Sequence, residues 1–230
     1  KRTELGAIPD VVNHVPVPFD GNVEPYLELL ARYGLTSGAV NSDVGNLNDP
    51  GYDQASLRVI AEPLLTLAAA TGGALIVPCG RQTWEDYVDE DTDLRNVAKN
   101  LRFLSTLCAD AGVRLMVEVL HHRRWIHTVE RANKLLDLAD ASVFGLLFDV
   151  AHVGASDEDV VGWAVQAFDR IERVHFRDAV PGNLNVGIGR GNVDFAGVIG
   201  ALESRGYQGH YILELETHDV EEADREADAL

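Results

Sequence analysis

The chain is poor in basic residues and in cysteine. Its 230 residues include 37 acidic side chains but only 19 Lys and Arg, which gives a formal net charge of −18. Because such a surface repels a phosphate backbone, we expect no general nucleic-acid binding. The two cysteines, Cys79 and Cys108, have no metal-ligand spacing and are too few for a disulfide framework. We therefore expect two buried thiols in a protein of the reducing cytoplasm.

The chain also lacks a long hydrophobic run. Its most apolar stretch, residues 61–78, is interrupted by Glu62, Pro63 and the pair Gly72-Gly73, so it is shorter than the roughly 20 residues of a membrane span. No linker, charge block or low-complexity segment divides the sequence. With 46% hydrophobic residues, the chain can bury a full core. We expect a single globular domain over residues 1–230, with no membrane partner, and the composition leaves a homo-oligomer open.

What the sequence does contain is an alternation of short apolar runs with longer amphipathic stretches. This alternation is typical of βα units around a parallel sheet. Some of the runs are continuously apolar, such as Ala-Leu-Ile-Val at 74–77, which indicates strands covered on both faces. Six strands are predicted, at residues 35–41, 74–79, 114–120, 143–150, 173–177 and 211–216.

Helices are predicted between these strands. Three of them end at a glycine and cover residues 23–33, 94–111 and 195–205. A further helical pattern covers residues 219–230. The side chains suited to capping a helix N-terminus are Thr128, Asp194 and the pair Ser156 and Asp159. Because Pro63 lies within the apolar pattern 54–70, that segment is predicted as two helical pieces or one kinked helix.

Six βα units fit either an open doubly wound sheet or most of a (β/α)₈ barrel. The doubly wound sheet is weakly supported, because Gly187-Ile-Gly189-Arg-Gly191 is followed by Asn192 where the dinucleotide-binding pattern requires glycine. In parallel βα folds, the chemistry gathers where the strands deliver their carboxyl ends. The last residues of each predicted strand are therefore the candidates for a functional site.

Four consecutive predicted strands end in side chains that bind metals: Glu118, Asp149, His175 and Glu214. Taken singly, each has an ordinary alternative as a helix cap, a salt-bridge partner or a hydrogen-bonded core histidine. Taken together, one imidazole and three carboxylates indicate a hard, mostly oxygen site, suited to Mn²⁺, Mg²⁺ or Co²⁺ rather than to a structural Zn²⁺. Glu216 shares a strand face with Glu214 by the period of two, so it is an alternative fourth ligand.

The motifs around these strand ends are specific in combination. They are Glu118 within Val-Glu-Val, Asp149-Val-Ala-His152, His175-Phe-Arg-Asp178, and Gly206-Tyr-Gln-Gly209 ahead of Leu213-Glu214. Over about residues 30–220 the sequence resembles the xylose isomerase-like TIM barrel superfamily, and within it the sugar phosphate isomerases and epimerases. The resemblance implies a (β/α)₈ barrel in which His152 contacts the substrate. It also implies one divalent ion, Mn²⁺ first with Mg²⁺, Co²⁺ or Zn²⁺ as alternatives, held by Glu118, Asp149, His175 and Glu214.

The resemblance assigns the six predicted strands to positions three to eight of the barrel. Residues 1–6 would then be the loop after the second strand, and the first one to two βα units would lie outside this chain. We therefore expect an incomplete ring in which the strand at 35–41 is an exposed edge.

The resemblance further implies proton transfer next to a carbonyl, through a cis-enediolate held by the ion. Glu118 and Glu214 would lie on nearly opposite sides of the ring, so one would take a proton and the other return it. This predicts a metal-dependent isomerase or epimerase of a small sugar, sugar phosphate or sugar acid. The alternatives are a metal-dependent dehydratase, that is a lyase of a polyol-derived ketone, and a barrel relative that only binds a ligand.

The segment after Glu118 departs from the ketose 3-epimerases, because it is basic: residues 121–127 contain three histidines and two arginines. One interpretation is a solvated loop, and the other is recognition of an anionic substrate group. On the second interpretation His121 and Arg124 bind substrate. Arg190, in the glycine-rich loop, would assist them, since loops near the last barrel strands often bind phosphate.

The family also includes enzymes that cut DNA at apurinic sites, and these need further histidine ligands. The predicted strand at 74–79 ends in Pro78-Cys79, and the loop after the fifth strand contains Asn183 and Asn185 where such ligands would stand. The sequence therefore argues against a nuclease. Two further side chains, His14 and Trp84, are candidates to roof the pocket, with simple loop packing as the alternative.

Overall fold

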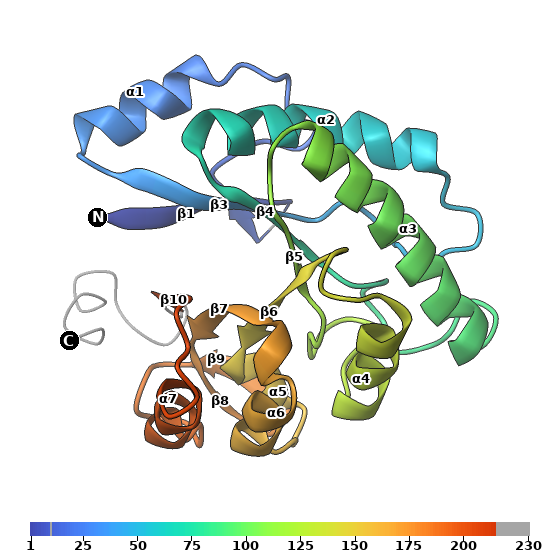
Figure 1. Ribbon diagram of the computed structural model, residues 1–230, viewed down its shortest axis with the longest axis vertical. Helices are drawn as coiled ribbons and strands as arrows, with labels where there is room; N and C mark the ends of the chain where they lie inside the picture. The colour runs from blue at the N-terminus through green and yellow to red at the C-terminus, as the bar shows by residue number, and fades with distance from the viewer. Residues whose placement is uncertain (10, 215–230) are drawn as a thin grey trace.

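The fold is built on a curled sheet of eight strands, surrounded by helices (Figure 1). The computed structural model describes residues 1–9 and 11–214. The strand order is β10-β7-β6-β5-β4-β3-β1-β2, and all neighbours are parallel except β1 and β2. The strands are β1 (Arg2–Ile8), β2 (Val12–Asn13), β3 (Thr36–Ser42), β4 (Ala74–Pro78), β5 (Leu115–Glu118), β6 (Gly145–Asp149), β7 (Ile171–Phe176) and β10 (His210–Leu213).

All six predicted strands are present, as β3, β4, β5, β6, β7 and β10, with ends that shift by up to three residues. The sheet is not closed, because β10 lies at one edge and the β1–β2 pair at the other. Its seven parallel strands make an incomplete ring of the (β/α)₈ type, as predicted. A short antiparallel hairpin, β8 (Asp178–Val180) and β9 (Asn183–Val186), follows β7.

The prediction for the first residues was wrong. Residues 2–8 are not a loop but form β1, which pairs in parallel with β3, so the strand predicted at 35–41 is not the exposed edge that we expected. Leu5 and Ala7 of β1 are buried in the main core, whereas Glu4 lies opposite Ala39 of β3 and faces the inside of the ring. The first half of β1 is polar, with Arg2, Thr3 and Glu4, so the apolar part of the strand is short, and this hides the strand in the sequence.

The helices form an arc around the outside of the sheet (Figure 1). They are α1 (Glu24–Arg32), α2 (Gln54–Thr71), α3 (Glu90–Asp110), α4 (Val129–Leu138), α5 (Val150–Ala155), α6 (Val160–Gln166), the 3₁₀ helix η1 (Phe168–Arg170) and α7 (Phe195–Glu203). Of the two alternatives predicted for 54–70, the structure shows a single helix, α2, with Pro63 inside it. No helix among the described residues is long and apolar enough to cross a membrane.

Side-chain caps fix where these helices begin. Thr128 and Asp194 cap α4 and α7 as predicted. Asp159 alone caps α6, since Ser156 instead ends α5, so that half of the predicted pair was wrong. α3 starts four residues earlier than predicted, because the Asp89 carboxylate accepts a hydrogen bond from Thr92 N. The pattern at 219–230 lies outside the described residues.

An apolar layer covers each face of the sheet. The larger core lies between the sheet and its helices and includes both predicted buried thiols, Cys79 and Cys108, which are free. A small cluster of Ala39, Ala74, Ile76, Met116 and Leu147 fills the inside of the ring. The strands are thus covered on both faces, as their continuous apolar runs require, and their carboxyl ends open at one rim.

Candidate active site

The four predicted ligands follow the carboxyl ends of four neighbouring strands. Glu118 ends β5, Asp149 ends β6, His175 lies near the end of β7 and Glu214 directly follows β10. Parallel register brings them to one level: Asp149 pairs with His175, and Glu214 N donates a hydrogen bond to Phe176 O. Oxygen or nitrogen atoms of Asp149, His175 and Glu214 lie within 4.8 Å of one another.

His175 and Glu214 are joined directly. His175 Nδ1 lies 3.0 Å from Glu214 Oε2, and Arg177 Nη1 donates to Glu214 Oε1 at 2.8 Å. Burial by itself would raise the pKa of Glu214, but the hydrogen bond from His175 and the charges of His175 and Arg177 outweigh it and lower the pKa to about 2. Glu214 is therefore a carboxylate at every working pH.

The two carboxylate oxygens of Asp149 have different surroundings. Oδ1 accepts hydrogen bonds from Ala151 N and His152 N and so caps α5. Oδ2 is buried and has no hydrogen-bond partner among the described residues. Burial, followed by the charge of Glu214, raises the pKa of Asp149 to about 6. A buried carboxylate oxygen without a donor is costly unless something positive pairs with it.

Glu118 is buried beside the same group. Its pKa is raised well above the ordinary value, first by burial and then by the charges of Asp149 and Glu214. Its Oε1 lies 3.4 Å from His152 Nε2. The structure therefore brings the four predicted ligands into two adjacent groups: Asp149, His175 and Glu214 form one, while Glu118 stands with His121 and His152 in the other.

His121 and His152 are held in one tautomer. His122 N donates to His152 Nδ1 at 3.1 Å, and Arg123 N donates to His121 Nδ1 at 3.2 Å. A ring nitrogen that accepts a hydrogen bond carries no proton, so each neutral ring has its proton on Nε2. Burial lowers the pKa of both rings, that of His121 to about 3. The two imidazoles, with centroids 3.7 Å apart, are neutral N–H donors rather than free metal ligands.

The two arginines predicted to bind substrate have different surroundings. Arg124 is buried, where its Nη2 pairs with Asp43 Oδ2 at 2.6 Å and its Nη1 donates to Gly80 O. Its guanidinium thus binds other parts of the protein, and the structure pairs it with Asp43 rather than with the carboxylates of the four predicted ligands. Arg190 lies exposed in the glycine-rich loop. That loop is organised by the buried Asp178 carboxylate, which accepts hydrogen bonds from three of its backbone amides.

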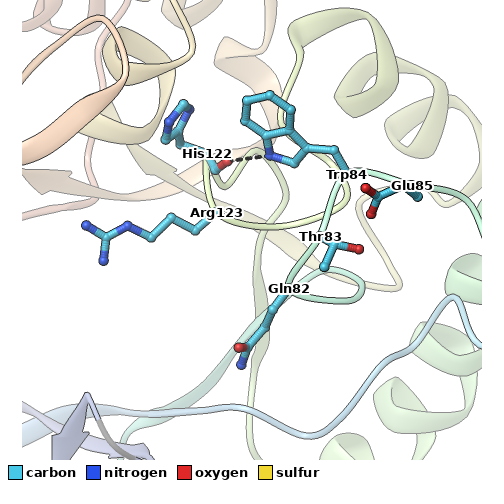
Figure 2. A pocket seen from close by; sticks show the side chains of 6 residues that line it. All are labelled: Gln82, Thr83, Trp84, Glu85, His122 and Arg123. Carbon is cyan, nitrogen blue, oxygen red and sulfur yellow. Dashed lines mark hydrogen bonds between the residues drawn. The ribbon is translucent and has the colours of Figure 1, made fainter.

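A pocket of about 380 Å³ lies at the rim, between the loops that follow β4 and β5 (Figure 2). Trp84 forms part of its wall, with 52% of the residue exposed. The indole is fixed, because Nε1 donates to His122 O at 2.9 Å and the ring stacks on His127 at 4.3 Å. The pocket is lined by Gln82, Thr83, Trp84, Glu85, His122 and Arg123.

None of the four predicted ligands lines this rim pocket, but two of its residues, His122 and Arg123, hold the histidines beside Glu118, and Arg123 does so through the hydrogen bond from its amide to His121 Nδ1. The amide of His122 donates to His152 Nδ1, while its carbonyl accepts from Trp84. His14, the other predicted roof residue, is exposed and accepts a hydrogen bond from Gly6 N within its own hairpin. Glu216, the alternative ligand, lies outside the described residues.

Sequence reasoning missed three charged residues beside the site: Glu4, Arg173 and Arg177. The period of two along β7 places both arginines on the face of His175, and this signal was available in the sequence. Glu4 contacts His175 from β1, a strand that the sequence did not reveal. No local pattern connects residues 171 positions apart.

Comparison with known proteins gives consistent results. The sequence profile of the xylose isomerase-like TIM barrel family matches residues 7–230. Inosose dehydratase of Clostridium perfringens is 27% identical over 157 residues, which cover 56% of this chain and 50% of that protein. The chain spans about half the length of the curated relatives it matches first.

Solved structures share the fold at low identity. The 3-keto-D-glucoside 4-epimerase YcjR of E. coli superposes with a TM-score of 0.71 at 20% identity, over 100% of this chain and 98% of that one. The IOLI protein with a bound zinc atom superposes with a TM-score of 0.70 at 18% identity, over 92% of this chain and 78% of that one.

Proposed function

Because the chain belongs to the xylose isomerase-like TIM barrel family, we propose that it is a divalent-metal-dependent isomerase or epimerase of a small sugar, sugar phosphate or sugar acid. Two of the proteins named above are a dehydratase and an epimerase. The observation that carries the proposal is the buried Oδ2 of Asp149, which lacks a donor and lies among Glu118, His175 and Glu214.

These residues fit a divalent cation. The pKa values of Glu118 and Asp149 are raised first by burial and then by the charges of neighbouring carboxylates, and a positive ion would offset both effects. Glu118, Asp149, His175 and Glu214 would hold the ion. Their oxygen-rich set favours Mn²⁺, with Mg²⁺ and Co²⁺ next, while the zinc of the IOLI protein keeps Zn²⁺ among the alternatives. When bound, such an ion supplies positive charge that makes the C–H beside a carbonyl more acidic.

Glu118 and Glu214 would move the proton. Glu118 ends β5 and Glu214 follows β10, with β6 and β7 between them, so they approach a substrate carbon from different sides. A carboxylate that takes a proton on one face and a carboxyl that returns one on the other invert the carbon, which is epimerisation. Return of the proton to the neighbouring carbon interconverts an aldose and a ketose.

His121 and His152 would stabilise the charge that develops on the substrate oxygens. Both are locked with a proton on Nε2 and are neutral, so they donate hydrogen bonds without needing to titrate. Fixed donors in a buried site are effective because they require no reorganisation during the reaction. Arg190, which is exposed, stays a candidate for binding an anionic group of the substrate, and the exposed Arg123 in the rim pocket is added to it.

A dehydratase is the second candidate, and the match to inosose dehydratase favours it. The same carboxylates would remove the proton beside the carbonyl. The difference lies in the next step, in which a hydroxyl on the β-carbon leaves as water instead of the proton returning. A barrel that only binds a ligand is the third candidate. It would show no turnover, with or without Glu118 and Glu214.

Incubation with a sugar panel in D₂O separates these candidates. We would load the purified protein with Mn²⁺, Co²⁺ or Mg²⁺ and analyse the sugars by mass spectrometry. Deuterium in recovered sugar supports isomerisation or epimerisation, and loss of one water supports the dehydratase. Glu118→Gln and Glu214→Gln are expected to lower exchange at least about 100-fold.

The matched control is Glu172→Gln, on the outside of β7, where Glu172 pairs with Arg114 at a half-exposed position. This variant is expected to keep wild-type exchange. A protein that holds no divalent ion after loading, or whose metal content is unchanged by Asp149→Ala, would contradict the catalytic proposal.

A further inference from the structure

The imidazole of His175 is held at both of its nitrogens. Nδ1 lies 3.0 Å from Glu214 Oε2, on the side of the proposed metal site, and Nε2 lies 2.9 Å from Glu4 Oε2. The ring is buried, at 3% exposure. Glu4 therefore reaches His175 from β1, across the inside of the ring of strands, and meets the nitrogen that faces away from the carboxylate group.

Glu4 is itself fixed in place. Its second oxygen, Oε1, accepts from Arg173 Nη1 at 2.6 Å, and Arg173 Nη2 donates to Gly38 O at 3.1 Å. The side chains of Glu4 and Arg173 are largely buried. Both oxygens of Glu4 are occupied, so it is not an additional free ligand for an ion. Its position is set by β7 on one side and by the register of β1 with β3 on the other.

Both nitrogens of His175 face carboxylates, but only Nδ1 lies on the side of Glu214 and the proposed metal site. A metal binds an imidazole through a nitrogen without a proton, while the other nitrogen keeps its proton and donates it. With an ion bound in place of the proton between Nδ1 and Glu214, the Glu4 carboxylate would keep the remaining proton on Nε2 and leave the Nδ1 lone pair to the ion. We propose that Glu4 is a positioning residue that fixes the ring of His175, so that Nδ1 faces the ion. This inference rests on the metal site proposed above.

A second consequence concerns the basicity of the ligand. A carboxylate that accepts from Nε2–H makes the ring more electron-rich and so strengthens its bond to an ion. Loss of such a partner typically weakens metal affinity about 10 to 100-fold. A carboxylate that served only to neutralise Arg173 would have no such effect, and this difference is measurable.

Cobalt binding provides the test. Co²⁺ is titrated into the metal-free chain and followed by calorimetry and by its visible absorption. Glu4→Gln is expected to weaken Co²⁺ binding about 10 to 100-fold and to change the absorption spectrum. Arg173→Lys keeps a positive partner for Glu4 and is expected to bind Co²⁺ within about threefold of wild type. Glu172→Gln, on the outside of the same strand, is expected to bind as wild type does.

The outcomes are distinct. If wild type binds Co²⁺ and Glu4→Gln binds it with the same affinity and spectrum, Glu4 does not position His175 and the proposed metal site stands. If Arg173→Lys loses as much affinity as Glu4→Gln, the loss does not depend on the carboxylate at Nε2 and the positioning role of Glu4 is overturned. If wild type binds no divalent ion, the proposed function itself is wrong.

A measurement on wild type makes the test independent of how the variants fold. In Zn²⁺-loaded protein with ¹⁵N-labelled histidine, NMR identifies which ring nitrogen of His175 carries a proton. We expect the proton on Nε2 and the metal on Nδ1. A metal on Nε2 would overturn the inference.

Discussion

Arg124 and Asp43 form a buried ion pair that joins the loop after β5 to the loop after β3. Arg124 Nη2 lies 2.6 Å from Asp43 Oδ2, and the two side chains are 6% and 16% exposed. The same guanidinium donates to Gly80 O in the loop after β4. One side chain therefore connects three of the loops that form the rim above the carboxylate groups.

Removing this arginine should destabilise the protein strongly. Arg124→Gln leaves Asp43 buried without its partner, and loss of one member of a buried pair costs about 3–5 kcal/mol. Arg58→Gln is the matched control, since Arg58 and Glu62 form an exposed pair one helical turn apart and should lose less than about 1 kcal/mol. Urea unfolding of both variants checks this. Equal losses would show that the Arg124 pair contributes no more than a surface contact.

Asp149→Asn should weaken metal binding and stabilise the metal-free protein. Asparagine keeps an Oδ1 to accept from Ala151 N and His152 N, so the cap of α5 is retained. Removal of the charge takes away repulsion with Glu214. We expect metal affinity to fall by more than about 100-fold, and the metal-free protein to gain on the order of 1–3 kcal/mol near neutral pH. Metal titration and denaturant unfolding without metal test the two halves. A metal-free variant less stable than wild type would contradict the repulsion argument.

The metal-free protein should respond to acid in an unusual direction. The pKa of Asp149 is raised from 3.8 to about 6 by burial and by Glu214. Between these two values the folded state holds a proton that the unfolded state does not, so this group stabilises the fold as the pH falls through about 6. The stability advantage of Asp149→Asn over wild type is therefore expected to shrink between about pH 7.5 and pH 5. Thermal unfolding in chelator at several pH values measures it, and an advantage that grows on acidification would contradict the sign.

Trp84 should affect substrate binding more than chemistry. Its fixed, half-exposed indole lines the rim pocket but contacts the proposed site only through the backbone of His122. We expect Trp84→Ala to raise KM about fivefold, equivalent to about 1 kcal/mol of aromatic contact, with kcat little changed. Trp84→Phe retains a ring and should lie close to wild type. A drop in kcat at unchanged KM would instead place Trp84 in the chemistry.

Much of the fold could be predicted because its signals are local. The apolar run at 74–77 is β4, and Thr128 and Asp194 cap helices as their spacing indicated. The candidate site was equally accessible, because parallel strands bring their ends together. Glu118, Asp149, His175 and Glu214 could be selected from strand ends alone.

The features that were missed depend on contacts between distant parts of the chain. Arg124 resembles a free cation in the sequence, since Asp43, its partner, is 81 residues away. Glu4 lies on a strand whose polar residues conceal it. Ser156 has the right type for a cap, but the end of α5 occupies that position. In each case burial against a remote segment, rather than residue type, decides the role.

The strand order also bears on how the chain folds. Each parallel strand pairs with the next parallel strand along the chain, so the sheet can grow by successive short loop closures. Among the described residues, side chains connect β1 to the far end of the sheet: Glu4 meets Arg173 of β7 across 169 residues, and Arg2 meets His210 of β10 across 208. Such contacts form once the strands between them are in place. We expect Glu4→Gln to speed unfolding and to leave the refolding rate unchanged, so that this pair acts as a kinetic latch on the assembled ring.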